Sequence, residues 1–210
     1  MALKRRTVNV DGGIPRDGTL PLTFPDRAFI MKWPGFTDCR TGRARKEGVP
    51  MVTKPNRDST DPLYRARERP ELVDVPTLPF VQLDGQGDPG GEPFSLVIQA
   101  LYAFSYAVKM SYRSKEVPTG YEAYRVFPLE GVWDLVDPGK GLQVKDNLRY
   151  TLMIRQPAFL TSALFDRFRE EVRLRKPLLP TDRLRFVCEA EGLCCQMLHV
   201  GPYADEPRTM

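Results

Sequence analysis

Tyr124-Arg-Val-Phe-Pro-Leu-Glu-Gly-Val-Trp133 is the stretch of sequence from which we predict the fold and the site. It places a single carboxylate, Glu130, close to Trp133 and after a tyrosine-bearing segment, Tyr121 to Phe127, which we expect to be a strand. Aromatic faces beside one acid are typical of a pocket for an aromatic, often cationic, small molecule. The alternative is that Trp133 fills the core and Glu130 is a solvated turn residue, and the local pattern alone favours that alternative.

The sequence after residue 65 has the periods of helices and strands. Leu148, Tyr150, Leu152 and Ile154 alternate with Arg149, Thr151, Met153 and Arg155, which predicts a half-buried strand. Glu92 to Arg113 predicts a helix with Pro93 in its first turn and an apolar stripe made of Phe94, Val97, Leu101, Phe104 and Val108. Thr161 can cap a second helix that runs to about Arg175, with a buried stripe of Leu164, Phe165, Phe168 and Val172. Further strands are expected at 80–83, 184–188 and 193–200.

Four segments together resemble the GyrI-like small-molecule-binding family. Besides Tyr124 to Trp133 they are Val75 to Pro89, Tyr150 to Pro157 and Glu191 to Tyr203. The resemblance covers the chain from about Asp61 onwards, and it is specific because several separate motifs agree in order and spacing.

The resemblance implies an α+β fold in which tandem βαββ units form one antiparallel sheet with helices packed on one face. We expect residues 1–64 to be a Pro/Gly/Arg-rich, partly disordered extension that adds little to the core, and 65–210 to be the GyrI-like domain. Family members continue where this chain stops at Met210, so the second unit is expected to be incomplete and the domain C-terminally short. An incomplete sheet leaves an open edge, through which we expect self-association.

The resemblance also implies a function, for which three alternatives stay open. The first is a binding protein for bulky aromatic, often cationic, small molecules, with a role in xenobiotic or antibiotic protection. The second is a hydrolase that opens activated cyclopropanes of DNA-alkylating compounds, with Glu130 as base and Tyr124 as proton donor. The third is a protein-interaction inhibitor of a nucleic-acid enzyme. The candidate ligand-binding residues are Tyr102, Tyr106, Tyr124, Glu130, Trp133, Met153 and Tyr203.

Composition sets limits on partners and location. The chain has 210 residues and a net charge of only +4, so we expect no nucleic-acid partner, and we read the Arg40 to Lys46 cluster as a solvated loop. No apolar run follows Lys4 to Arg6, which argues against a signal peptide, and Glu92 to Arg113 is interrupted by polar residues. We therefore expect a cytoplasmic protein without a membrane partner.

Cofactor and metal chemistry are not indicated. The four cysteines include no CxxC pair and the chain has one histidine, His199, so we expect reduced thiols, no metal site and no cofactor. Gly85-Gln-Gly87-Asp-Pro-Gly90 matches a dinucleotide-binding pattern, but two aspartates and a proline there would oppose phosphate binding. We predict a plain glycine turn at this position and a structural role for His199.

Overall fold

A computed structural model gives the fold. For residues 61–140 and 144–200 it describes backbone and side chains, except the side chain of Pro62. For residues 5–9 and 29–34 it describes the backbone alone. The two helices are α1 (Glu92–Met110) and α2 (Ser162–Arg175). The strands are β1 (Arg5–Asn9), β2 (Phe29–Pro34), β3 (Glu71–Val75), β4 (Leu78–Gln86), β5 (Leu129–Leu135), β6 (Leu148–Arg155), β7 (Arg185–Glu189) and β8 (Gly192–His199).

The strands form one antiparallel sheet in the order β3-β8-β2-β1-β5-β6-β4-β7. With α1 and α2 packed against it, this sheet confirms the predicted α+β class. The unit β4–α1–β5–β6 has the predicted βαββ order, and α2, β7 and β8 follow it.

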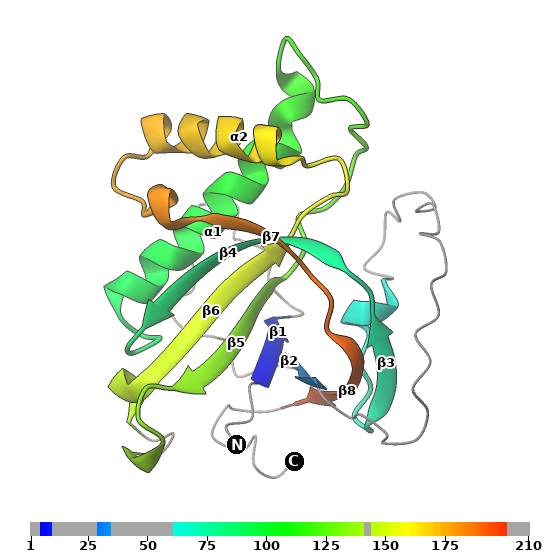
Figure 1. Cartoon of the computed structure of the whole chain (residues 1–210), viewed down its shortest axis with the longest axis vertical. Coiled ribbons are helices and arrows are strands. Elements are labelled where there is room, and N and C mark those ends of the chain that lie inside the picture. Colours follow the sequence, from blue (N-terminus) through cyan, green and yellow to red (C-terminus); the bar gives the residue numbers. More distant parts are fainter. Residues whose placement is uncertain (1–4, 10–28, 35–60, 141–143, 201–210) are drawn as a thin grey trace.

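The strand pairs at the two ends of this order, β3 with β8 and β4 with β7, are the two halves of one long two-stranded ribbon. Val75 of β3 pairs with Gly192 of β8, and three residues further on Leu78 of β4 pairs with Glu189 of β7, so the register continues unchanged through the bend. Gly192 has a φ of 67°, which glycine adopts without strain. In Figure 1 the ribbon arches from β4 and β7 over to β3 and β8. The sheet therefore curves round the face that the helices leave uncovered.

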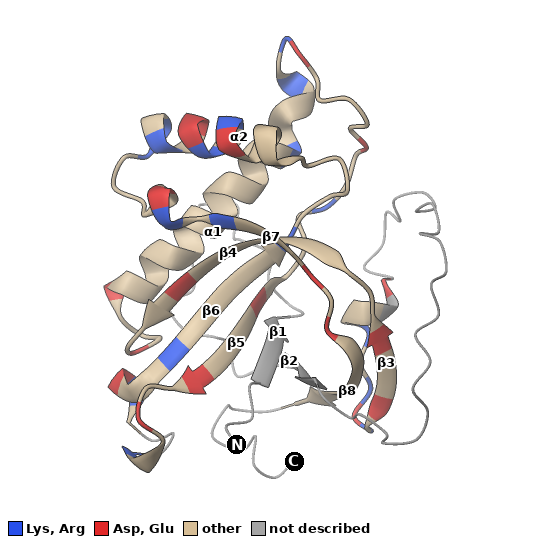
Figure 2. Cartoon of the chain, in the orientation of Figure 1, with Lys and Arg blue, Asp and Glu red and all other residues tan. Residues whose placement is uncertain are grey.

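Helix α1 covers the other side of the sheet, which we call the helix face. Its predicted apolar stripe is buried throughout. The stripe packs on Val81 and Leu83 of β4 and on Leu152 and Ile154 of β6. Figure 2 shows α1 almost without charge along its length, whereas α2 carries acidic and basic residues in alternation.

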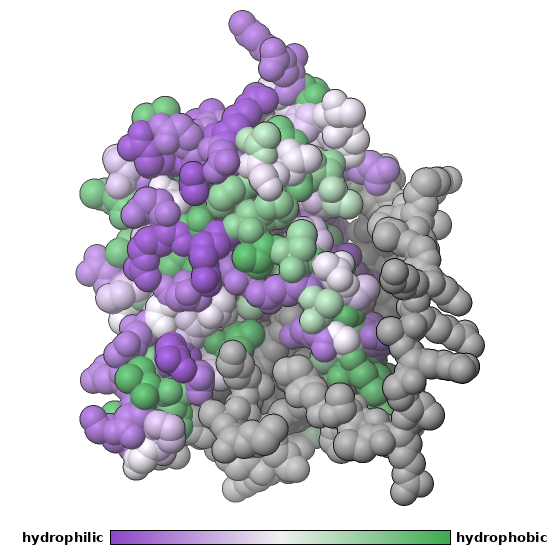
Figure 3. Space-filling model, viewed as in Figure 1, coloured by the Kyte–Doolittle hydropathy of each residue, from purple (hydrophilic) through white to green (hydrophobic). Residues whose placement is uncertain are grey.

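Helix α2 begins as predicted. The Thr161 hydroxyl accepts a hydrogen bond from the Leu164 amide at 3.3 Å, which caps the first turn. Phe165, Phe168 and Val172 are buried, and Leu164 is partly buried. The outer side of α2 carries the ion pairs Asp166–Arg169, Glu170–Arg173 and Glu171–Arg175. Figure 3 shows mainly hydrophilic residues over α2, as expected for a helix with one solvated side.

A second, smaller core lies on the opposite side of the sheet, which we call the inner face. Val75, Leu78, Phe80, Met153 and Cys194 are buried together there. They come from β3, β4, β6 and β8, so the bent ribbon brings both halves of the sheet to one interior. Alternation along each strand decides which residues reach this face.

The segment from Tyr121 to Pro128 is not a strand, which makes that prediction wrong. Gly120 has a φ of 77°, and Pro128 has no amide hydrogen to give to a ladder. The Tyr121 hydroxyl instead donates to the Lys109 carbonyl at 2.7 Å, and the aromatic rings of this segment pack against their neighbours. Strand β5 starts directly after Pro128.

The extension is described in part. Its segments 5–9 and 29–34 supply the backbone of β1 and β2, between β5 and β8, so it takes part in the sheet. Residues 10–28, 35–60 and 201–210 lie outside the described residues, and with them Cys39 and Tyr203. The partial disorder of the extension stays a prediction. Cys188, Cys194 and Cys195 are free thiols.

The glycine-rich segment between β4 and α1 forms a turn, as predicted. Gly87 has a φ of 106°. Gly85 has a different reason to be glycine, because a Cβ there would lie 2.3 Å from the ring of Tyr150. Tyr150 is 2% exposed and is packed against Phe94 and Trp133, so its ring has little room to move.

Gly85→Ala should therefore overpack the helix face and lower the free energy of unfolding by about 1–3 kcal/mol. Gly90→Ala is the control, because a Cβ at Gly90 would be 3.4 Å from Asp88, and its effect should stay within about 0.5 kcal/mol. Urea unfolding followed by circular dichroism measures both. Equal stability of the two variants would contradict the close approach of Gly85 and Tyr150.

Candidate functional site

Strand β5 places Glu130 on the inner face and Trp133 on the helix face. Leu129 and Trp133 belong to the helix-face core. Glu130 pairs across the sheet with Met153, which belongs to the inner-face core. Residues three apart on a strand point to opposite sides, so the two residues cannot line one pocket.

Glu130 is held by a phenol from a distant part of the chain. The Tyr64 hydroxyl donates to Glu130 Oε1 at 2.8 Å, and the Glu130 residue is 1% exposed. A hydrogen bond to a carboxylate is roughly twice as strong as one between neutral groups. The pair thus combines an acid, a phenol and little access to solvent.

Tyr64 is carried by a short 3-10 turn, Pro62–Tyr64, which together with Asp61 we call the Tyr64 turn. Asp61 Oδ1 accepts from the Leu63 amide at 3.0 Å, and the Asp61 carbonyl accepts from the Tyr64 amide at 2.9 Å. Asp61 Oδ2 accepts from Arg155 Nη1 at 2.5 Å, which ties the turn to the end of β6. The ring of Tyr64 packs with Leu63, Phe127 and Leu198.

A row of aromatic rings leads away from the Tyr64 phenol. The ring of Phe127 lies 6.2 Å from that of Tyr64 and 6.1 Å from that of Tyr124. The Arg155 guanidinium lies over Phe127 at 4.7 Å. Burial, and secondarily Tyr121, raise the pKa of Tyr124 above its usual value. Its hydroxyl is buried and has no hydrogen-bond partner within the described part of the chain.

The floor beside Glu130 is made of uncharged polar and sulfur-containing side chains. Met153 lies opposite Glu130, and its sulfur accepts from Gln82 Nε2 at 3.9 Å. Further along the sheet, on β8 and separated from β5 by β2 and β1, Gln196 is also buried, at 1% exposed. Its Oε1 has no hydrogen-bond partner among the residues that the structure describes. Such amides can orient a polar ligand atom.

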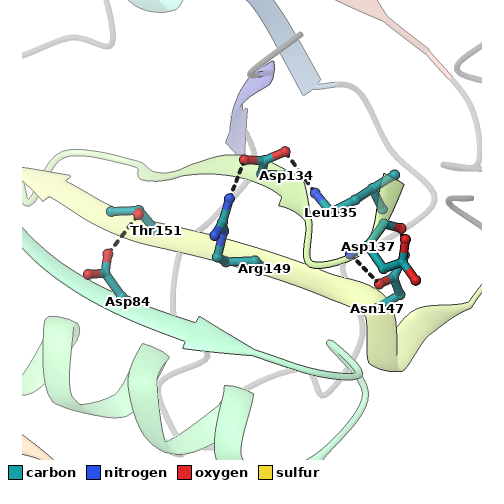
Figure 4. A network of polar contacts seen from close by, with 7 residues as sticks. All are labelled: Asp84, Asp134, Leu135, Asp137, Asn147, Arg149 and Thr151. Atoms are coloured by element: carbon teal, nitrogen blue, oxygen red, sulfur yellow. Dashed lines mark hydrogen bonds and ion pairs between the residues drawn. The ribbon is translucent and has the colours of Figure 1, made fainter. Parts of the chain in front are cut away.

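Towards the beginning of β6, near Arg149 and Thr151, the inner face is exposed to solvent and carries charged side chains. Figure 4 shows Asp134 turned towards Arg149, and Asp84 towards Thr151, across neighbouring strands. The Asp134–Arg149 contact is 2.6 Å and the Asp84–Thr151 contact 2.7 Å. These pairs hold strands together at the surface, whereas the Glu130 pair lies in the interior.

The predicted site residues therefore separate into two groups. Glu130 and Met153 lie together on the inner face, and Tyr124 lies two rings from Tyr64. Trp133 is packed against Phe94 and Tyr150, with ring centroids 5.9 and 5.4 Å apart. Tyr102 is on α1 in the helix-face core, and Tyr106 beside it is 38% exposed. Tyr203 lies outside the described residues.

Sequence reasoning missed Tyr64, Asp61, Arg155 and Phe127. Tyr64 and Asp61 fall in the part assigned to the extension, where no period marks them. Phe127 belongs to the quoted stretch, but the sequence pattern predicts a strand there and gives no sign of a site residue. Arg155 offered one signal, because it is a charged residue at the end of an otherwise half-buried strand and is only partly exposed.

Metal binding and membrane insertion have no support in what is described. Among residues 61–140 and 144–200, no three metal-ligating side chains come together. No described helix combines the length and the apolar character that crossing a membrane requires. The chemistry that the site offers is that of a buried carboxylate and a phenol, which can exchange a proton with a bound molecule.

Three solved structures from Listeria innocua resemble the chain. An uncharacterized conserved protein is 37% identical with a TM-score of 0.66, and the match covers 70% of this chain and 72% of that one. Two further structures, each described as a hydrolase, are 36% identical. Their TM-scores are 0.63 and 0.66, and the matches cover 70% of this chain and 74% and 72% of theirs. No protein-family model matches, and neither does any curated protein.

Tyr64→Phe should lower the free energy of unfolding by about 1–3 kcal/mol, because it leaves a buried carboxylate with one partner fewer. In a double-mutant cycle with Glu130→Gln, the two changes should be coupled by more than about 0.5 kcal/mol. Urea unfolding of the four proteins measures this coupling. Strictly additive effects would contradict the contact.

Alkaline pH should destabilise the protein through Tyr102. Burial, and secondarily Tyr106, raise the pKa of Tyr102 to about 12 from 10.0. The folded state therefore disfavours the phenolate, and the resulting stability is complete below pH 10 and declines as the pH rises from 10 to 12. In this pH range, Tyr102→Phe should make the free energy of unfolding fall less steeply than in the parent, by up to about 1.4 kcal/mol per pH unit. Unfolding at several pH values measures it, with Tyr112→Phe as a control for the loss of a phenol. An unchanged slope in Tyr102→Phe would refute the assignment.

Proposed function

The chain belongs to the same protein family as these Listeria innocua proteins, and from this membership we propose that it is a hydrolase that binds a small molecule at Glu130. The observation that carries the proposal is the buried hydrogen bond between the Tyr64 hydroxyl and Glu130. The motifs quoted above further support placing the family among GyrI-like small-molecule-binding proteins.

The proposed substrate is a bulky aromatic molecule with an activated cyclopropane, as in certain DNA-alkylating compounds. The row of rings at Tyr64, Phe127 and Tyr124 offers apolar surface next to Glu130. An aromatic substrate gains both from apolar burial and from contact between rings. A positive charge on the substrate would gain from the carboxylate of Glu130.

The reaction uses one carboxylate and one phenol. Glu130 takes a proton from a water molecule while the oxygen of that water attacks the cyclopropane carbon. The ring C–C bond breaks, and its electron pair moves through the conjugated system to the substrate carbonyl, which takes a proton from the phenol. Transfer of the proton from Glu130 back to the phenolate completes the net addition of one water.

Tyr64 is the phenol best placed for this role. Its hydroxyl is 2.8 Å from Glu130, whereas Tyr124, the donor expected from the sequence, is separated from Tyr64 by the ring of Phe127. Tyr124 then serves as an aromatic wall. General acid and base groups in such positions contribute roughly 10²–10⁴-fold each.

A ligand-binding protein without turnover is the second candidate. It is favoured by Met153 and Gln82, uncharged side chains in line with Glu130 across the sheet, which fit binding as well as catalysis. Protection would then come from sequestering the molecule. The two candidates share one site and differ in the role of Glu130.

Incubation with a spirocyclopropyl cyclohexadienone tests the proposal, with mass spectrometry following the product that has gained one water. We expect turnover by the parent, its loss in Glu130→Gln and a fall of roughly 10²-fold or more in Tyr64→Phe. The matched control is Asp134→Asn, which removes a carboxylate from the same strand and the same face, next to Arg149. It should leave turnover unchanged.

Calorimetry with the same compound separates the two candidates. Binding without turnover, weakened by Glu130→Gln for a cationic analogue more than for a neutral one, supports the binding protein. Turnover that survives in Glu130→Gln places the chemistry elsewhere. If the protein shows no binding and no turnover of the compound, both candidates are refuted.

A further inference from the structure

The structure assigns to Arg155 the role of a positioning residue, which holds the Tyr64 phenol against Glu130 by acting through Asp61. The inference rests on the proposed function, because it concerns the residue that prepares the catalytic pair. Arg155 itself contacts neither Glu130 nor the Tyr64 hydroxyl in any described hydrogen bond, so its action is indirect.

Asp61 links the two ends of this arrangement. One carboxylate oxygen caps the Tyr64 turn through the Leu63 amide, and the other pairs with Arg155. The Asp61 carbonyl accepts from the amide of Tyr64 itself. A displacement of Asp61 would therefore move the backbone from which the phenol projects.

Arg155 is a fixed anchor for Asp61. Its backbone pairs with Phe80 at the end of β6, and its guanidinium lies 4.7 Å from the centre of the Phe127 ring. The same ring packs against Tyr64, so Arg155 supports the phenol from a second side. The side chain of Arg155 is 18% exposed, and a pair that is partly withdrawn from water is screened less than one at the surface.

The Tyr64 turn depends on such an anchor. A three-residue 3-10 turn has few internal hydrogen bonds and is marginal by itself. The position of the phenol, by contrast, must hold to within a fraction of an ångström for efficient proton transfer. The Asp61–Arg155 pair supplies the link between this short turn and the rigid sheet.

Arg149 provides a matched comparison. It lies on the same strand and the same face as Arg155 and also pairs with an aspartate, Asp134, at 2.6 Å. Its side chain is 59% exposed, and no described contact joins it to Tyr64. Replacing either arginine by methionine removes one ion pair from β6, but only Arg155→Met removes a contact of the Tyr64 turn.

Nitration of tyrosines by tetranitromethane, mapped by mass spectrometry, tests the inference without a substrate. Arg155→Met should raise the nitration rate of Tyr64 roughly fivefold, which corresponds to a loss of about 1 kcal/mol in the free energy of opening the Tyr64 turn. Arg149→Met should not change it. Exposed Tyr112 and buried Tyr150 are internal references whose rates should stay the same in both variants.

Asp61→Asn gives an independent variant, because the asparagine oxygen can still cap the turn while the charge on which Arg155 acts is removed. It should raise Tyr64 nitration as Arg155→Met does, and the double variant should show no further increase. Arg155→Lys keeps the charge and should restore part of the protection. Protection of Tyr64 that persists in folded Arg155→Met, or in Asp61→Asn if the former does not fold, would overturn the inference.

Kinetics with the cyclopropane compound gives the functional readout. Arg155→Met should lower kcat with little change in KM, and it should have no further effect in a Tyr64→Phe background. An equal effect in both backgrounds would overturn the action through Tyr64. If the parent shows no turnover, the proposed hydrolase fails, while the nitration result still decides whether Arg155 holds the phenol.

Discussion

The unbroken register of the long ribbon is the constraint on which the rest of the structure depends. Strands β3 and β4 pair with β8 and β7 in one register on the two sides of a bend. The pairing keeps its register at the bend, but the alternation between the two faces shifts by one residue there, because Val75 and Leu78, three residues apart, both belong to the inner-face core. As a result, Val75 and Cys194 face the same interior as Phe80 and Met153. The site exists because this curvature turns one face of the sheet into an enclosed surface.

The two faces of the sheet serve different purposes. The helix face is filled with aromatic and aliphatic side chains from α1, α2 and the strands, and most of the buried hydrophobic residues described belong to it. The inner face has a smaller core and carries buried polar residues, among them Glu130, Gln82 and Gln196. Buried polar groups cost stability unless they are paired. The larger helix-face core provides the stability that makes such a polar interior tolerable.

Local patterns in the sequence predicted much of the fold and only part of the site. The alternation over 148–155, the stripe of α1 and the Thr161 cap depend on neighbouring residues, so their periods are visible. The contacts of Glu130 with Tyr64 and of Arg155 with Asp61 span 66 and 94 residues, and no local period reports them. The interpretation that joined Trp133 to Glu130 relied on nearness in sequence, although the strand period places them on opposite faces.

The same ribbon has a consequence for the order in which the protein is made. Strands β4, β5 and β6 and helix α1 lie within residues 78–155 and can assemble as soon as that stretch has been synthesised. Strand β7, which pairs with β4, and strand β8, which pairs with β3, come later, and each pairs with a segment more than 100 residues earlier in the chain. Contacts of such long separation form slowly. Until residues 185–199 have left the ribosome, β3 has no β8 to pair with, and the inner-face core lacks Cys194, so the Tyr64–Glu130 contact can form before the wall beside β3 is complete.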